Sequence, residues 1–250
     1  MSTTSAPTST APARAPKRAL ALAAWVVLAA GQIALVYSAN YAVDETETGG
    51  LEPFYEYRTA IWNTVAYAVL AGLTVAIARL LAHPTAALGL RPFAHRWVWA
   101  AIGVVVAAGV LTAVIAIASG VDAGEEQGYL PDTWRPDRAG AVAANAVVAV
   151  AVAPLVEELF FRGLGVSVLS VLGSMAAVVV SGLAFALAHG LLVGLAPLAL
   201  FGVGLAWVRF RSRSVWPGFI AHALYNGAAL TLGLLCLSNP TCRGEAAALF

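Results

Sequence analysis

Long apolar runs separated by short charged segments dominate the chain. An α-helix needs roughly 20 apolar residues to cross a bilayer, and most of these runs have about that length. Because lipid offers no partners to backbone polar groups, helices are the expected form of such runs. The pattern predicts an all-α, polytopic membrane protein with about seven transmembrane helices. These are expected at residues 19–37, 59–78, 97–119, 139–172, 174–190, 191–208 and 215–236.

The chain divides into four parts. Residues 1–18 are mainly Ser, Thr, Ala and Pro with basic residues at the end, which is typical of a disordered tail. Residues 19–139 hold the first three helices and two acidic loops, residues 140–236 hold a core with polar residues inside apolar helices, and residues 237–250 form a short tail. A signal peptide is the alternative interpretation of the first run, but its length favours a retained helix.

The composition excludes an ordinary soluble protein, since 60% of the residues are hydrophobic and only 11% are charged. The formal net charge is +1, so nothing indicates a nucleic-acid partner, and the lipid bilayer is the expected surrounding. Basic residues gather in the N-terminal tail and the loops at 79–96 and 209–214, whereas acids gather at 38–58 and 120–138. This bias predicts a multi-pass cell-membrane protein with its N-terminus in the cytoplasm and its C-terminus outside.

The two cysteines, Cys236 and Cys242, follow the last predicted helix. The topology places both outside the cytoplasm, where a disulfide can form. Two free thiols are the alternative, and the sequence does not decide between them.

Two adjacent carboxylates and an arginine interrupt the most apolar part of the chain. Glu158 and Arg162 are four residues apart, so a helix brings them to one face with the acid first, which is the favoured order. Glu157 is rotated by about 100° and stays available for chemistry. Pro154 cannot donate to the carbonyl of Val150, so a kink and a freed acceptor are expected there. A structural salt bridge is the alternative interpretation, but it needs only one acid.

Further polar side chains follow on the next helices. Phe185 and His189 are one turn apart, as are His222 and Asn226. Each pair alone can be a helix–helix contact. Together with Glu157 they suit peptide hydrolysis by an activated water, with the carboxylate as base and the amide as donor to an oxyanion. Glu157, His189 and His222 can also hold zinc or another divalent metal.

These motifs, in this order, resemble the CPBP family of intramembrane endopeptidases, which comprises CAAX prenyl proteases and bacteriocin-processing enzymes and is also called Abi. The resemblance covers about residues 140–236 and rests on Glu157-Glu158-x-x-x-Arg162, Phe185-x-x-x-His189 and His222-x-x-x-Asn226. It implies that Glu157 activates water, that His189 and His222 complete the site and that Asn226 stabilises the oxyanion. Glu158, Arg162 and Phe185 match the supporting positions. The family chemistry can be written with or without a metal.

The sequence therefore predicts a membrane endopeptidase, with a site reached from the cytoplasmic side, that cleaves a peptide or a membrane-anchored protein. The Ala-, Val- and Arg-rich composition suggests a bacterium of high genomic GC, for which a prenylated substrate is not expected. A non-proteolytic scaffold, as in bacteriocin immunity or regulation, is one alternative. A proton or ion pathway is another, but it would require polar residues at graded depths along several helices.

The predicted topology can be tested by labelling a single cysteine. With Cys236 and Cys242 replaced by Ser, Ser212→Cys lies in the basic turn at 209–214 and should react in intact cells only with a membrane-permeant thiol reagent. Labelling of residue 212 by an impermeant reagent would reverse the orientation.

Overall fold

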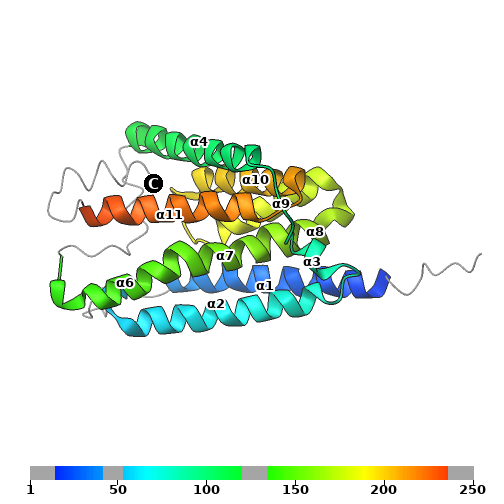
Figure 1. Ribbon diagram of the computed structural model, residues 1–250, viewed down its shortest axis with the longest axis horizontal. Coiled ribbons are helices and arrows are strands. Elements are labelled where there is room, and N and C mark those ends of the chain that lie inside the picture. The colour runs from blue at the N-terminus through cyan, green and yellow to red at the C-terminus, as the bar shows by residue number, and fades with distance from the viewer. Residues whose placement is uncertain (1–14, 42–52, 120–133, 236–250) are drawn as a thin grey trace, which may run out of the picture.

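The computed structural model of the protein describes residues 15–41, 53–119 and 134–235. The all-α prediction is confirmed, since these residues form helices and no strand. The long helices lie side by side and alternate in direction along the long axis of the molecule (Figure 1). The N-terminal part contributes α1 (Ala15–Tyr41), η2 (Pro53–Tyr55), α2 (Tyr57–Ala78), α3 (Pro84–Ala87) and α4 (Arg96–Ser119).

The C-terminal part begins with one long helical rod and continues with a hairpin and a last helix. The rod changes its winding along its length. It consists of η3 (Pro136–Arg138), α6 (Ala139–Val147), η4 (Val148–Val152), α7 (Ala153–Glu157), η5 (Glu158–Gly165), α8 (Val166–Leu169) and η6 (Ser170–Leu172). Both η4 and η5 are π-helical. The hairpin is α9 (Ser174–Leu187) and α10 (Leu195–Ser212), and α11 (Trp216–Leu235) is last.

The predicted turn after the rod is confirmed, because Gly173 adopts a φ of 97°, which favours glycine. The rod also continues past Arg162 as expected. Other boundaries differ. Residues 15–18, assigned to the tail, already belong to α1, and α10 runs over 195–212 rather than 191–208. Cys236 and Cys242, with their predicted disulfide or free thiols, lie outside the described residues, as do residues 1–14 and 237–250.

Five helical segments of the described chain are long and apolar enough to cross a membrane. The expected number of seven is not confirmed, because α9 has only 14 residues, or about 21 Å, against a hydrocarbon core of roughly 30 Å. In this hairpin α9 therefore covers only part of the depth, whereas α10 has 18 residues. The five segments are Pro16–Ala39, Tyr57–Ala78, Arg96–Ile115, Pro136–Leu172 and Trp216–Leu235.

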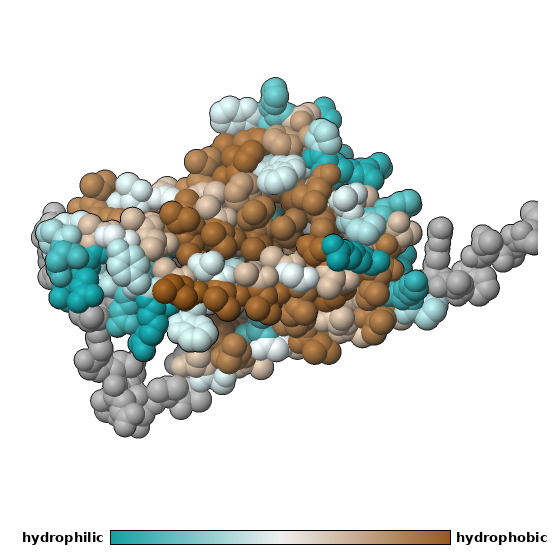
Figure 2. All heavy atoms as spheres, turned by 60° about the horizontal axis from the view of Figure 1, so that its bottom comes forward, coloured by the Kyte–Doolittle hydropathy of each residue, from teal (hydrophilic) through white to brown (hydrophobic). Residues whose placement is uncertain are grey.

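The outer surface is apolar, as a protein solvated by lipid requires. Leu35, Trp99 and Ile117 expose 70%, 71% and 84% of their surface. In Figure 2 a broad band of hydrophobic side chains covers one face, with hydrophilic residues toward the two ends. Large apolar patches of this kind mark a membrane or protein contact, and here they encircle helices of spanning length. The chain is a polytopic α-helical membrane protein.

One end of the bundle gathers the basic residues. The start of α1, the loop between α2 and α4 and the turn between α10 and α11 meet there (Figure 1). Arg18 donates from Nη2 to Ser170 Oγ over 2.7 Å, and Ser214 donates from Oγ to the carbonyl of Arg91 over 2.7 Å. We call this the basic end. Its composition agrees with the predicted orientation, which the fold itself does not determine.

The hairpin of α9 and α10 is held together by a close backbone contact at two glycines. A Cβ on Gly182 would collide with the backbone nitrogen of Val203, and one on Gly202 would collide with the carbonyl oxygen of Gly182. Small residues allow helices in membranes to approach this closely and to pack by van der Waals contact.

We expect Gly182→Ala to force these helices apart and to lower the free energy of unfolding by roughly 1–3 kcal/mol, the usual cost of overpacking. The measurement is thermal unfolding in detergent. Gly103→Ala is the matched control, since a Cβ at this position on α4 meets nothing within 4 Å. Equal stabilities of the two variants would contradict the close contact.

Candidate active site

The centre of the site is a buried ion pair. The predicted pairing is confirmed, with Arg162 Nη1 3.2 Å from Glu158 Oε1 and both side chains fully buried. Breaking up such a pair is costly because the remaining charge stays in an apolar interior. The pair therefore ties the two halves of η5 together in the middle of the bundle.

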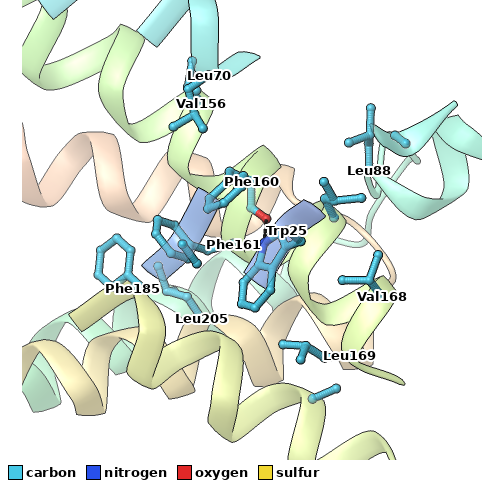
Figure 3. Close-up of a cluster of buried hydrophobic side chains, with 14 of the residues drawn as sticks. Trp25, Leu70, Leu88, Val156, Phe160, Phe161, Val168, Leu169, Phe185 and Leu205 are labelled. Carbon is cyan, nitrogen blue, oxygen red and sulfur yellow. Dashed lines mark hydrogen bonds between the residues drawn. The ribbon is translucent and has the colours of Figure 1, made fainter. Parts of the chain in front are cut away.

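Aromatic rings enclose the guanidinium. The Cζ of Arg162 lies 3.7 Å from the ring centroid of Phe185, which is within cation–π distance. Phe161 meets Phe185 edge to face at 5.5 Å between centroids, and Phe201 stacks on it at 5.8 Å. Figure 3 shows Phe160, Phe161 and Phe185 grouped in the buried core. Phe185, predicted as a supporting residue, thus contacts the cation directly.

His222 connects the two carboxylates. Its Nδ1 lies 3.3 Å from Glu158 Oε1, and its Nε2 lies 3.8 Å from Glu157 Oε2. The imidazole is 97% buried, since only 3% of its side chain is exposed. Glu157, Glu158 and His222, which the sequence placed on two separate helices, are brought together. The imidazole lies between Glu158, which pairs with Arg162, and Glu157.

Glu157 is the acid that does not pair with the arginine, as the helical spacing predicted. Its Oε1 accepts a hydrogen bond of 2.7 Å from the hydroxyl of Tyr67 on α2. Sequence reasoning missed this tyrosine because the recognised motifs lie wholly in the last four predicted helices. Among the polar side chains of α2, which include Arg58, Asn63 and Thr64, nothing in the sequence singles out Tyr67.

His189 lies in the bend directly after α9. Its Nδ1 donates to the carbonyl of Phe185 over 2.8 Å, which leaves Nε2 as the nitrogen that can accept or donate in the site. Its ring lies 4.5 Å from that of Phe185 between centroids, and Phe185 also contacts His222 at 5.6 Å. The bend thus brings the second imidazole to the same aromatic cluster as the first.

Asn226 bonds to the backbone of η4. Its Nδ2 donates to the carbonyl of Ala149 over 2.9 Å. In a π-helix the N–H five residues later normally serves a carbonyl, and for Ala149 that residue is Pro154, which has no N–H. The freed acceptor expected from Pro154 is therefore present, but the π-helical winding moves it from Val150 to Ala149.

Two carbonyls of η5 receive side-chain donors in the same way. Trp25 on α1 donates from Nε1 to the carbonyl of Phe160 over 3.0 Å (Figure 3), and Ser181 on α9 donates from Oγ to that of Phe161 over 2.6 Å. Trp25 also stacks on the ring of Phe160, with 5.7 Å between centroids. Backbone groups in lipid need internal partners, so these donors stabilise the unusual winding.

The donor set does not fit a metal centre as arranged. Among the described residues, no group of three His, Cys, Asp or Glu side chains gathers so that it could hold an ion. Glu157, His189 and His222, the ligands expected from the sequence, lie in one region. Glu157 Oε1 is engaged by Tyr67, whereas the bond from His189 Nδ1 to a backbone carbonyl leaves Nε2 of that ring available.

The side chains of the site differ in exposure. Glu157 exposes 14% of its side chain, whereas Glu158 and Arg162 expose none. Large side chains fill the bundle between this layer and the basic end and are at most 2% exposed: Phe160, Phe161, Leu164, Phe185, Phe201 and Leu205. The approach from the cytoplasmic side stays a prediction, because neither the orientation of the bundle nor a route to Glu157 follows from these burials.

Comparison with known families agrees with this geometry. Residues 139–228 match the family described as Type II CAAX prenyl endopeptidase Rce1-like. The match begins at α6 and ends two residues after Asn226, so it includes every predicted site residue and leaves out Tyr67. Comparisons with curated proteins and with solved structures found no match. The resemblance of this region to CAAX proteases is thus confirmed.

The buried pair predicts a large effect of removing its cation. Arg162→Ala leaves Glu158 buried without its partner, so we expect the free energy of unfolding to fall by roughly 3–5 kcal/mol. Arg162→Lys should restore only part of it, because lysine lacks the planar group that stacks on Phe185. Thermal unfolding in detergent measures both variants.

The pair of Arg58 and Glu56, in which the cation is exposed and the acid is half-buried, provides the control. Its atoms are also 3.2 Å apart, but 76% of the Arg58 side chain is exposed. Exposed pairs contribute about 0–1 kcal/mol, so Arg58→Ala should be nearly neutral. An Arg162→Ala variant as stable as Arg58→Ala would contradict the importance of the buried pair.

Proposed function

Residues 139–228 form a CAAX-endopeptidase-type region within a multi-pass membrane protein, and on this premise we propose that the protein hydrolyses a peptide bond by a glutamate-activated water. One observation carries the proposal. A second, partly exposed carboxylate stands beside a buried ion pair that already satisfies the structural need for an acid. Such a spare ionisable group in a membrane helix is expensive to keep and is usually functional.

Glu157 Oε2 is the atom proposed as the base. Its other oxygen is occupied by Tyr67, and Oε2 faces His222 Nε2 at 3.8 Å. In the proposed reaction Oε2 removes a proton from water while the water oxygen forms a bond to the carbonyl carbon of the peptide. The same carboxyl then gives the proton to the departing amine as the C–N bond breaks.

The remaining side chains support the charge that develops on the substrate. His222 and His189 can donate hydrogen bonds near Glu157 from nitrogens that face the site. Asn226 donates one amide proton to the carbonyl of Ala149, and its second amide proton is proposed to stabilise the oxyanion. Donors held in place within a dry site stabilise such a charge far more than they would in water.

Metal assistance, which the sequence left open, supplies no step in this proposal because the described donors do not gather as a metal site. The proposed substrate class is a peptide or a membrane-anchored protein. Its scissile bond must reach the level of Glu157 inside the bundle. Metal analysis of the purified protein tests whether a metal is bound, and a cleavage screen on membrane peptides tests the substrate class.

The decisive variant is Glu157→Gln, which keeps the shape of the side chain and removes the base. We expect cleavage to fall by about 10²–10⁴-fold, the usual contribution of general-base catalysis. Stability should not fall, since burying an amide costs less than burying a carboxylate. Rates are measured on the peptide found in the screen, with thermal unfolding in parallel and Glu56→Gln, at the start of α2, as a control outside the site.

The same variant separates an enzyme from a scaffold. A non-proteolytic immunity or regulatory protein needs the fold and the ion pair but not the base. Under that alternative, Glu157→Gln would retain the cellular phenotype. Wild-type cleavage by the variant would refute the mechanism, and an intact phenotype without cleavage would favour the scaffold.

A further inference from the structure

Tyr67 lies far from the matched region in sequence but touches its most reactive side chain. The residue is near the middle of α2, a helix that precedes the matched region of residues 139–228. Its hydroxyl donates to Glu157 Oε1 over 2.7 Å. That distance is in the range of strong hydrogen bonds to an ionised acceptor. A phenol has only one proton to donate, so this bond fixes the direction of the hydroxyl.

The bond distinguishes the two oxygens of Glu157. Oε1 carries the donor from Tyr67, while Oε2 faces the imidazole of His222. A free glutamate side chain rotates about its terminal bond and presents either oxygen. Tyr67 on α2 therefore holds Oε1, while His222 on α11 lies on the side of Oε2.

We propose that Tyr67 is the positioning residue that holds Glu157 and makes Oε2 the oxygen that receives the proton from water. The proposal rests on the proposed function of Glu157. It assigns a task to the N-terminal part of the chain, namely to supply the donor that orients the base. A packing role for Tyr67 would require only the ring, whereas the positioning role requires the hydroxyl.

The first test is kinetic. Tyr67→Phe removes the hydroxyl and keeps the ring, so we expect kcat to fall roughly 10- to 100-fold, which corresponds to the loss of a hydrogen bond to a charged group. KM and the thermal midpoint should stay close to those of the wild type. Tyr57→Phe is the matched control, because Tyr57 starts the same helix and is 58% exposed. An unchanged kcat in Tyr67→Phe would overturn the proposal.

The second test needs no substrate. The carboxylate band of Glu157 can be found by isotope-edited infrared spectroscopy as the band that disappears in Glu157→Gln. Loss of the donor from Tyr67 should shift this band in Tyr67→Phe and not in Tyr57→Phe. An unshifted band would refute the contact. If the wild type cleaves nothing, the proposed function fails while this measurement still tests the positioning.

The double variant tests whether the two residues act as one unit. In a Glu157→Gln background, Tyr67→Phe should lower the residual rate no further, since groups acting together are not additive. A further fall of the same size as in the wild type would show a separate role and overturn the proposal. Should Tyr67→Phe alone fail to fold, a double variant that folds would support coupling to the charge, and one that does not would show a purely structural role.

Discussion

The ion pair of Glu158 and Arg162 is the interaction on which the site depends. Both charges are withdrawn from solvent, so each needs several partners at once. The carboxylate is met by Arg162 and by His222, and a Cβ on Gly218 would approach its second oxygen closely. The cation in turn rests on Phe185. These contacts bring η5, α9 and α11 together and place His222 next to Glu157, although Glu158 Oε2 and the guanidinium nitrogens of Arg162 have no hydrogen-bond partner among the described residues.

A second constraint is the hydrogen bonding of the backbone in the long rod. Two π-helical segments flank the short α7 that carries Pro154 and Glu157. Side-chain donors from three other helices, Asn226, Trp25 and Ser181, reach carbonyls in these segments. In lipid no water compensates a missing partner, so the irregular winding persists only where neighbouring helices supply donors. The contacts that supply partners to these backbone carbonyls also hold the rod against the neighbouring helices of the site.

The sequence predicted what depends on local spacing and on apolar runs. The separation of Glu158 and Arg162 was sufficient for their pairing, and the long rod followed from uninterrupted apolar residues. It could not predict π-helical winding, which depends on donors from distant helices such as Asn226. Tyr67 was missed for a related reason, since its neighbours in α2 give no local sign of a partner 90 residues away. The close packing of Phe160, Phe185 and Phe201 likewise results from contacts among three helices, the rod, α9 and α10.

The short hairpin explains why the chemistry is concentrated at one depth. Because α9 ends at Leu187, the chain turns inside the bundle rather than beyond its end, and the bend carries His189. On the side of the basic end, packed rings and the ion pair leave no exposure, while Glu157 at the level of the bend remains partly exposed. Of the two adjacent acids, Glu157 is therefore the one that lies at the edge of the packed core, where Tyr67, from outside the matched region, donates to it.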